Sequence, residues 1–129
     1  MAFNGRFLLD VAYFSAQNGA DLKALIRATG HSEASLSDPN CKVESEAYNR
    51  MLRLALDMTG DTLSGLHMGE GMNLAGGGLI VQIIQSSSTV REALKYCCDF
   101  ANLGCSSLPM SMEEADGQCR IRMRPDPVW

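Results

Sequence analysis

The stretch that decides the fold is residues 89–123, TVREALKYCCDFANLGCSSLPMSMEEADGQCRIRM. Its first part repeats apolar residues at helical spacing, and its last part alternates apolar and polar residues with a period of two. The period changes after Gly104. We therefore expect one amphipathic helix followed by two strands, and an α+β fold class.

The helix opens with the form of a capping box. In Thr89-Val90-Arg91-Glu92 the hydroxyl of Thr89 can accept a hydrogen bond from the third helical N–H, and the Glu92 carboxylate can accept one from the N–H of Thr89. The apolar stripe of this helix comprises Val90, Ala93, Leu94, Cys97, Cys98 and Ala101. Gly104 is placed to end it.

The two strands have the pattern of an antiparallel hairpin. Asp116-Gly117 has the chemistry of a two-residue turn, which fixes the register. Three cross-strand pairs follow: Met112 with Ile121, Met110 with Met123, and Glu113 with Arg120. Pro109 cannot donate to a ladder, so the first strand is an edge strand unless a bulge intervenes. Because a two-stranded hairpin alone is barely stable, its apolar face must pack on the helices or be joined by strands that this chain does not contain.

Upstream of this stretch the same periodicity predicts a helical cluster. The expected helices are centred on residues 7–15, 22–26, 48–58 and 79–84, with a short helical turn at 63–66. Gly19, Gly30 and Gly60 are placed to end the first three. Residues 36–40 are expected to form a turn, because Pro fixes φ and Asp and Asn bond their own backbone. The prediction is a mostly helical cluster followed by a C-terminal antiparallel β-hairpin.

Composition excludes several classes of protein. The 129 residues have the size of one domain, and 46% hydrophobic with 20% charged residues is typical of globular chains. The net charge of -4 and dispersed basic residues do not suit a nucleic-acid surface. Five cysteines without C-x-x-C spacing do not suggest a disulfide framework. With no transmembrane run and no signal peptide in the sequence, we expect a cytoplasmic protein.

Four segments resemble a known family. They are residues 18–26, 36–43, 59–69 and 77–94, and their order and spacing are similar to the arabinose-binding-type N-terminal domain of AraC-family transcription regulators. The sequence departs from the family near Glu44 and at Ser88, where a Pro is common. The resemblance implies a bacterial sensing and dimerisation domain followed by two helix-turn-helix units. No such unit is present up to Trp129, so we expect residues 1–129 to be a single domain from a longer regulator.

Candidate catalytic and metal-binding residues are few. Cys97-Cys98 could form a redox or soft-metal sensor, but cysteines on an apolar stripe usually pack as small hydrophobic residues. His31 and His67 show no zinc-ligand spacing. Cys105 with His67 could form a nucleophile and base, but no motif orients them. The glycine-rich residues 71–78 lack a phosphate-loop signature. We therefore predict no enzyme, no metal site and no cofactor.

The methionines suit an adaptable cavity for a small organic effector, and they suit an ordinary core equally well. Those expected on inward faces are Met51, Met58, Met110, Met112 and Met123. Since the sequence does not separate pocket from core, no ligand residue is assigned. Two hypotheses remain: a domain that binds a small effector and controls a DNA-binding part outside this chain, with a homodimer possible, or a dimerisation module without a ligand. A small enzyme is the third hypothesis.

Overall fold

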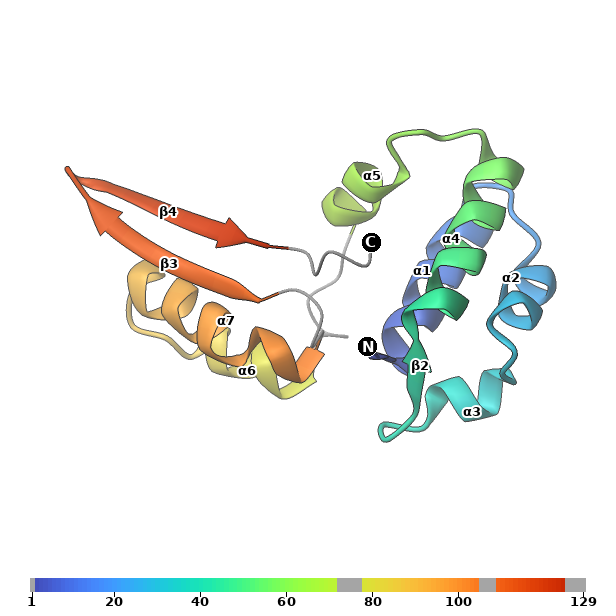
Figure 1. Cartoon of the computed structure of the whole chain (residues 1–129), viewed down its shortest axis with the longest axis horizontal. Helices are drawn as coiled ribbons and strands as arrows, with labels where there is room; N and C mark the ends of the chain where they lie inside the picture. The colour runs from blue at the N-terminus through green and yellow to red at the C-terminus, as the bar shows by residue number, and fades with distance from the viewer. Residues whose placement is uncertain (1, 72–77, 105–108, 125–129) are drawn as a thin grey trace. The chain divides into compact units, whose positions relative to one another are not determined.

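The computed structural model describes residues 2–71, 78–104 and 109–124. The chain folds into two compact units, Met1–Met72 and Asn73–Trp129, which we call the N-terminal unit and the C-terminal unit. Helices dominate both units, and the last two strands form a hairpin near the C-terminus (Figure 1). The predicted α+β class, a helical cluster followed by an antiparallel hairpin, is confirmed.

The N-terminal unit consists of helices and one short strand pair. Its elements are β1 (Ala2–Asn4), α1 (Gly5–Gln17), α2 (Leu22–Thr29), α3 (Glu33–Ser37), β2 (Lys42–Glu44), α4 (Ser45–Thr59) and α5 (Ser64–Gly71). Strands β1 and β2 are antiparallel, with Phe3 opposite Val43. The sequence does not indicate this pair, because strands of three residues are too short to show a period of two.

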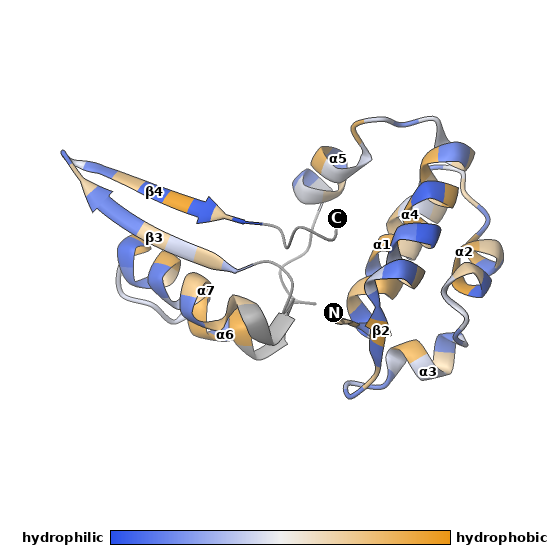
Figure 2. Ribbon diagram, viewed as in Figure 1, coloured by the Kyte–Doolittle hydropathy of each residue, from blue (hydrophilic) through white to orange (hydrophobic). Residues whose placement is uncertain are grey.

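A compact core lies between α1, α2, α3 and α4. The largest fully buried side chains are Leu8, Leu9, Leu25, Leu36, Met51 and Val43. Figure 2 shows the alternation of hydrophobic and hydrophilic residues along these helices that produces this burial. The rings of Phe3, Phe7 and Tyr48 add an aromatic cluster, in which Phe3 and Tyr48 have centroids 4.3 Å apart. This core supplies most of the stability of the unit.

Most predicted helix boundaries are confirmed. Asp21 caps α2 by accepting from the N–H of Ala24 at 3.2 Å. Gly19, Gly30 and Gly60 adopt positive φ where the helices end. The prediction that residues 36–40 form a turn is wrong for its first two residues, which belong to α3. Leu36 is fully buried there, since packing against α1 outweighs the local preference for a turn.

The C-terminal unit contains α6 (Gly78–Gln85), α7 (Val90–Gly104), β3 (Met110–Ala115) and β4 (Gln118–Met123). The predicted capping box is present: the N–H of Glu92 donates to Thr89 Oγ1 at 3.1 Å. The Glu92 carboxylate accepts from the N–H of Ser88 at 2.8 Å, one residue earlier than expected. No helix in the described ranges is long and apolar enough to span a bilayer.

The hairpin has the predicted register. Asp116 and Gly117 have φ values of 53° and 71°, the signs required by a two-residue type I′ turn. Met110 lies opposite Met123, Met112 opposite Ile121, and Glu113 opposite Arg120. Both apolar sets therefore share one face of the two-stranded sheet.

The two units differ in how completely they bury their apolar side chains. Among the residues whose burial is described, all the fully buried ones belong to the N-terminal unit. The side chains described in α6, α7, β3 and β4 are half-buried or exposed. Helix α7 contacts β3 far more than β4. Three residues expected on inward faces are exposed: Met58, Val90 and Met123, at 39%, 77% and 57%. Met58 lies in the last turn of α4, Val90 in the first turn of α7 and Met123 at the end of β4, where neighbouring elements do not cover them.

Gly5 provides a test of the packing of the first residue of α1 against α3 and Cys41. Its N–H donates to the carbonyl of Cys41 at 2.9 Å, and a Cβ at this position would lie 2.8 Å from the carbonyl oxygen of Leu36. We expect Gly5→Ala to lower the free energy of unfolding by about 1–3 kcal/mol, because backbone must move to admit the methyl group. Urea denaturation measures this change.

Gly65 is the matched control for that substitution. It lies in α5, and nothing lies within 4 Å of a Cβ built on it. Gly65→Ala should therefore stabilise the protein slightly, by about 0.5–1 kcal/mol, through the higher helix propensity of Ala. Equal effects at the two glycines would contradict the close packing at Gly5.

Candidate functional site

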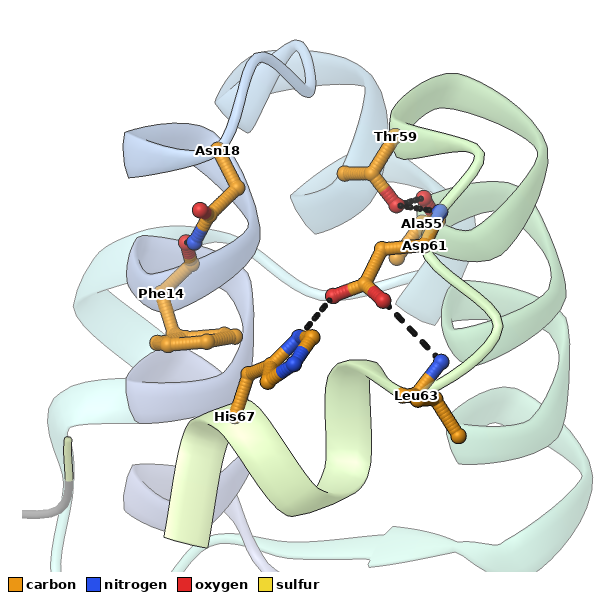
Figure 3. Close-up of polar contacts among 7 residues, drawn as sticks. All are labelled: Phe14, Asn18, Ala55, Thr59, Asp61, Leu63 and His67. Atoms are coloured by element: carbon orange, nitrogen blue, oxygen red, sulfur yellow. Dashed lines mark hydrogen bonds and ion pairs between the residues drawn. The ribbon is translucent and has the colours of Figure 1, made fainter. Parts of the chain in front are cut away.

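A polar network joins the end of α4 to α5. Asp61 lies in the turn between these helices, and its Oδ2 is 2.8 Å from Nδ1 of His67 on α5 (Figure 3). The Oδ1 atom of Asp61 accepts from the N–H of Leu63 at 3.0 Å, which shapes the turn. The N–H of Asp61 donates to Thr59 Oγ1, and the hydroxyl of Thr59 donates to the carbonyl of Ala55. The network thus fixes the start of α5 to the last turn of α4.

The two ionisable groups of this network shift each other's pKa. Hydrogen bonding and attraction to Asp61 raise the pKa of His67, and Glu70 contributes in the same direction. The hydrogen bond from His67, with that from the Leu63 N–H, lowers the pKa of Asp61. The His67 side chain is 52% exposed, so solvent screens the pair and its contribution to stability is small.

The Asp61–His67 pair resembles part of an acid–base site but lacks other parts. A nucleophile activated by a histidine must lie within hydrogen-bond reach of its second ring nitrogen. In the described ranges no hydroxyl or thiol is hydrogen-bonded to His67. Figure 3 shows Phe14 and Asn18 of α1 on the other side of the ring. Among the described residues, the pair links the turn after α4 to α5.

A second candidate region lies where α7 meets the hairpin. Two surface hollows of about 320 and 360 Å³ share Arg91 as a lining residue. One is lined by Arg91 and residues 114–119, and the other by Thr89, Arg91, Glu92, Lys95 and Tyr96. Both are open hollows of the surface rather than enclosed cavities.

Arg91 is the cation that the two hollows share, and the carboxylates of Glu92, Glu114 and Asp116 also line them. The Nε atom of Arg91 is 2.6 Å from Oε1 of Glu114 on β3, and this partner raises the pKa of Arg91. The side chain is nonetheless 74% exposed, and Lys95 lies one turn further along α7. The hydroxyl of Tyr96 donates to Glu92 at 3.3 Å. The guanidinium of Arg91, the ammonium of Lys95 and the backbone of the hairpin turn can therefore donate hydrogen bonds to a polar molecule.

The cysteines occupy different surroundings. Cys97 and Cys98 are half-buried in α7. The pKa of the Cys98 thiol is raised, mainly by burial and to a smaller extent by the neighbouring Cys97. A raised pKa disfavours the thiolate, which is the reactive and metal-binding form. Cys119 is exposed on β4, and Cys105 lies outside the described residues. The described thiols are free.

The other candidates are not brought together. The N–H of half-buried His31 donates to Thr29 Oγ1, and no group of three metal-ligating side chains forms among the described residues. Gly71 ends α5, Gly78 begins α6, and residues 72–77 lie outside the described ranges. The Asp61–His67 pair was not predicted from the sequence. An Asp that starts a turn, with a His in the following helix, is the signal that could have identified it.

Comparison with known protein families gives a match over most of the chain. The family model described as the arabinose-binding domain of AraC transcription regulator, N-term, matches residues 19–128. The match extends over the elements from α2 to β4 and includes both candidate regions. No curated protein matches the chain.

The Asp61–His67 pair predicts a pH dependence of stability. A raised His67 pKa means that its contribution is complete below the ordinary value of 6.5 and is lost as the pH rises through the folded-state pKa. A lowered Asp61 pKa means that its contribution is complete above the ordinary value of 3.8 and is lost as the pH falls through the folded-state pKa. The pair is therefore strongest between these two values.

We expect the melting temperature of His67→Asn to fall below that of the wild type near pH 5, and the difference to close at alkaline pH. Thermal denaturation from pH 5 to pH 9 measures it. Asp61→Asn is the control, because the amide oxygen can still accept from Leu63 while the charge is lost; NMR titration should show a lower His67 pKa in this variant. A pH-independent difference would contradict the assignment.

Proposed function

The chain belongs to the family of arabinose-binding N-terminal domains of AraC transcription regulators, and from this membership we propose that it binds a small organic effector and controls a DNA-binding domain outside this chain. The family consists of ligand-sensing regulatory domains and is not a class of enzymes. The observation that carries the proposal is the match over residues 19–128. A regulator of this kind acts on DNA in the bacterial cytoplasm.

We place the effector at the region where α7 meets the hairpin. Arg91 is the residue that both hollows share, and it can donate to a hydroxyl, carbonyl or carboxylate. The half-buried side chains of α7 and β3 leave this unit less tightly packed than the N-terminal core, which suits a site that adapts to a ligand. An effector changes the output only if it binds two arrangements of the regulator with different affinity.

A dimerisation module without a small-molecule ligand is the second candidate function. Leu63 directly precedes α5 and is 54% exposed, and Leu66 lies within α5 and is 68% exposed. Exposed large apolar residues that lie close together are typical of protein contacts. Sedimentation across a range of concentrations tests this candidate: Leu63→Ser with Leu66→Ser should convert dimers to monomers.

The effector proposal predicts thermal stabilisation by one chemical class of ligand. L-Arabinose is the first probe because of the family description, followed by other sugars, organic acids and fatty acids. A ligand present at one hundred times its Kd stabilises the folded state by about 2.7 kcal/mol, which raises the melting temperature measurably. Differential scanning fluorimetry is the screen, and calorimetry confirms a hit.

Variants then test the site. Arg91→Ala should weaken binding, whereas Arg53→Ala on the exposed surface of α4 should leave it unchanged. Equal loss in both variants would argue against the proposed site. A full-length regulator with paired helix-turn-helix units that responds to none of these classes would argue against effector sensing.

A further inference from the structure

Strand β4 has a free edge within the described part of the chain. It pairs with β3 on one side only. The N–H of Arg124 donates to the carbonyl of Pro109 at 3.2 Å, so this residue directs its backbone toward β3. Because successive residues of a strand alternate, Cys119, Ile121 and Met123 direct their N–H and C=O groups away from β3. These groups are available to another strand.

The apolar face of the sheet is incompletely covered beside this edge. Met123 is 57% exposed, whereas its cross-strand partner Met110 is half-buried. Helix α7 packs mainly on β3, which explains the difference. A sheet of two strands is marginally stable by itself. If another strand paired with β4, its apolar side chains at alternate positions would pack beside Ile121 and Met123 and would reduce the exposure of Met123.

The opposite face of β4 is strongly basic. Arg120, Arg122 and Arg124 alternate along the strand, and the register places them on the side away from Met123. Arg122 reaches Glu113 of β3 at 2.9 Å, whereas the side chain of Arg120 donates to Gln118 of its own strand. Carboxylates on a neighbouring strand would face this row of guanidinium groups, and lysines there would be repelled.

We propose that the free edge of β4 binds an extended segment of a partner protein in which apolar residues alternate with Asp or Glu. Strand β3 already pairs in this way with the inner edge of β4. Its methionines Met110 and Met112 lie opposite Met123 and Ile121, and its Glu113 lies opposite Arg120. Backbone hydrogen bonds would supply affinity, and the alternating side chains would supply specificity. The edge includes Cys119, which also lines one of the two hollows near Arg91.

Charge argues against a second copy of β4 as the occupant. Antiparallel pairing of two β4 strands would place the arginines of one beside those of the other, and like charges on neighbouring strands are destabilising. Pairing of β4 with the outer edge of β3 from another copy would be head-to-tail and would give a ring or an open filament rather than a discrete pair. An acidic segment avoids both problems.

Two peptides of matched length and β propensity test the proposal: acetyl-VEVEVEV-amide and the same peptide with Lys at each Glu position. NMR on the isotope-labelled chain reads binding and amide hydrogen exchange. We expect the Glu peptide to bind and to slow exchange at Cys119, Ile121 and Met123. The amides of Arg120 and Arg122 already face β3, so they serve as internal controls and should change little.

Two variants separate backbone pairing from charge. Cys119→Pro removes one outward donor without removing a bond to β3 and should weaken binding of the Glu peptide about tenfold, because proline is tolerated at a strand edge but cannot donate. The double variant Arg120→Glu/Arg122→Glu should reverse the preference toward the Lys peptide. Arg53→Glu on α4 is the control of equal charge change per site and should leave the preference unchanged.

Several results would overturn the proposal. Equal affinity for the two peptides would exclude the charge argument, and protection at other amides would exclude the β4 edge. Sedimentation that shows dimers of the wild type and monomers of Cys119→Pro would assign the edge to a second copy instead. A Glu peptide that does not bind a folded chain would refute the interaction directly.

Discussion

A sheet of two strands must cover one apolar face, and in this protein a helix covers mainly one of the two strands. Helix α7 packs on β3, while β4 extends beside it with Met123 exposed. The consequence is a marked difference between the units. The N-terminal unit encloses Leu8, Leu25 and Met51 completely, whereas the described part of the C-terminal unit has no fully buried side chain. Burial of apolar area is the main source of stability, so the N-terminal unit is the more firmly folded of the two.

This difference matters for a ligand-sensing domain. Segments with few buried contacts open and rearrange at lower free-energy cost than closely packed ones. The candidate effector region around Arg91 lies in the less completely packed unit, and the Asp61–His67 pair lies in the other. A sensing domain needs a stable framework and a part that responds to its ligand, and these two units have properties that fit those roles.

The parts of the fold that depend on local chemistry could be predicted from the sequence. The hairpin followed from a period of two and the Asp116-Gly117 turn, and α7 followed from its capping box. Features that depend on distant neighbours could not be predicted in this way. Strands β1 and β2 are too short to show a period of two. Leu36 lies in α3 rather than in a turn because its side chain packs in the core of the N-terminal unit. The exposure of Met58 and Met123 likewise depends on which elements cover them.

The exposed position of Cys119 gives the protein a natural attachment point for a spectroscopic label. Of the described cysteines, Cys41, Cys97 and Cys98 are half-buried, and burial raises the pKa of the Cys98 thiol. We expect a maleimide fluorophore to react first with Cys119 among these four thiols, because the reaction requires access to the sulfur. Its emission would then report on the surroundings of β4 without any engineered residue.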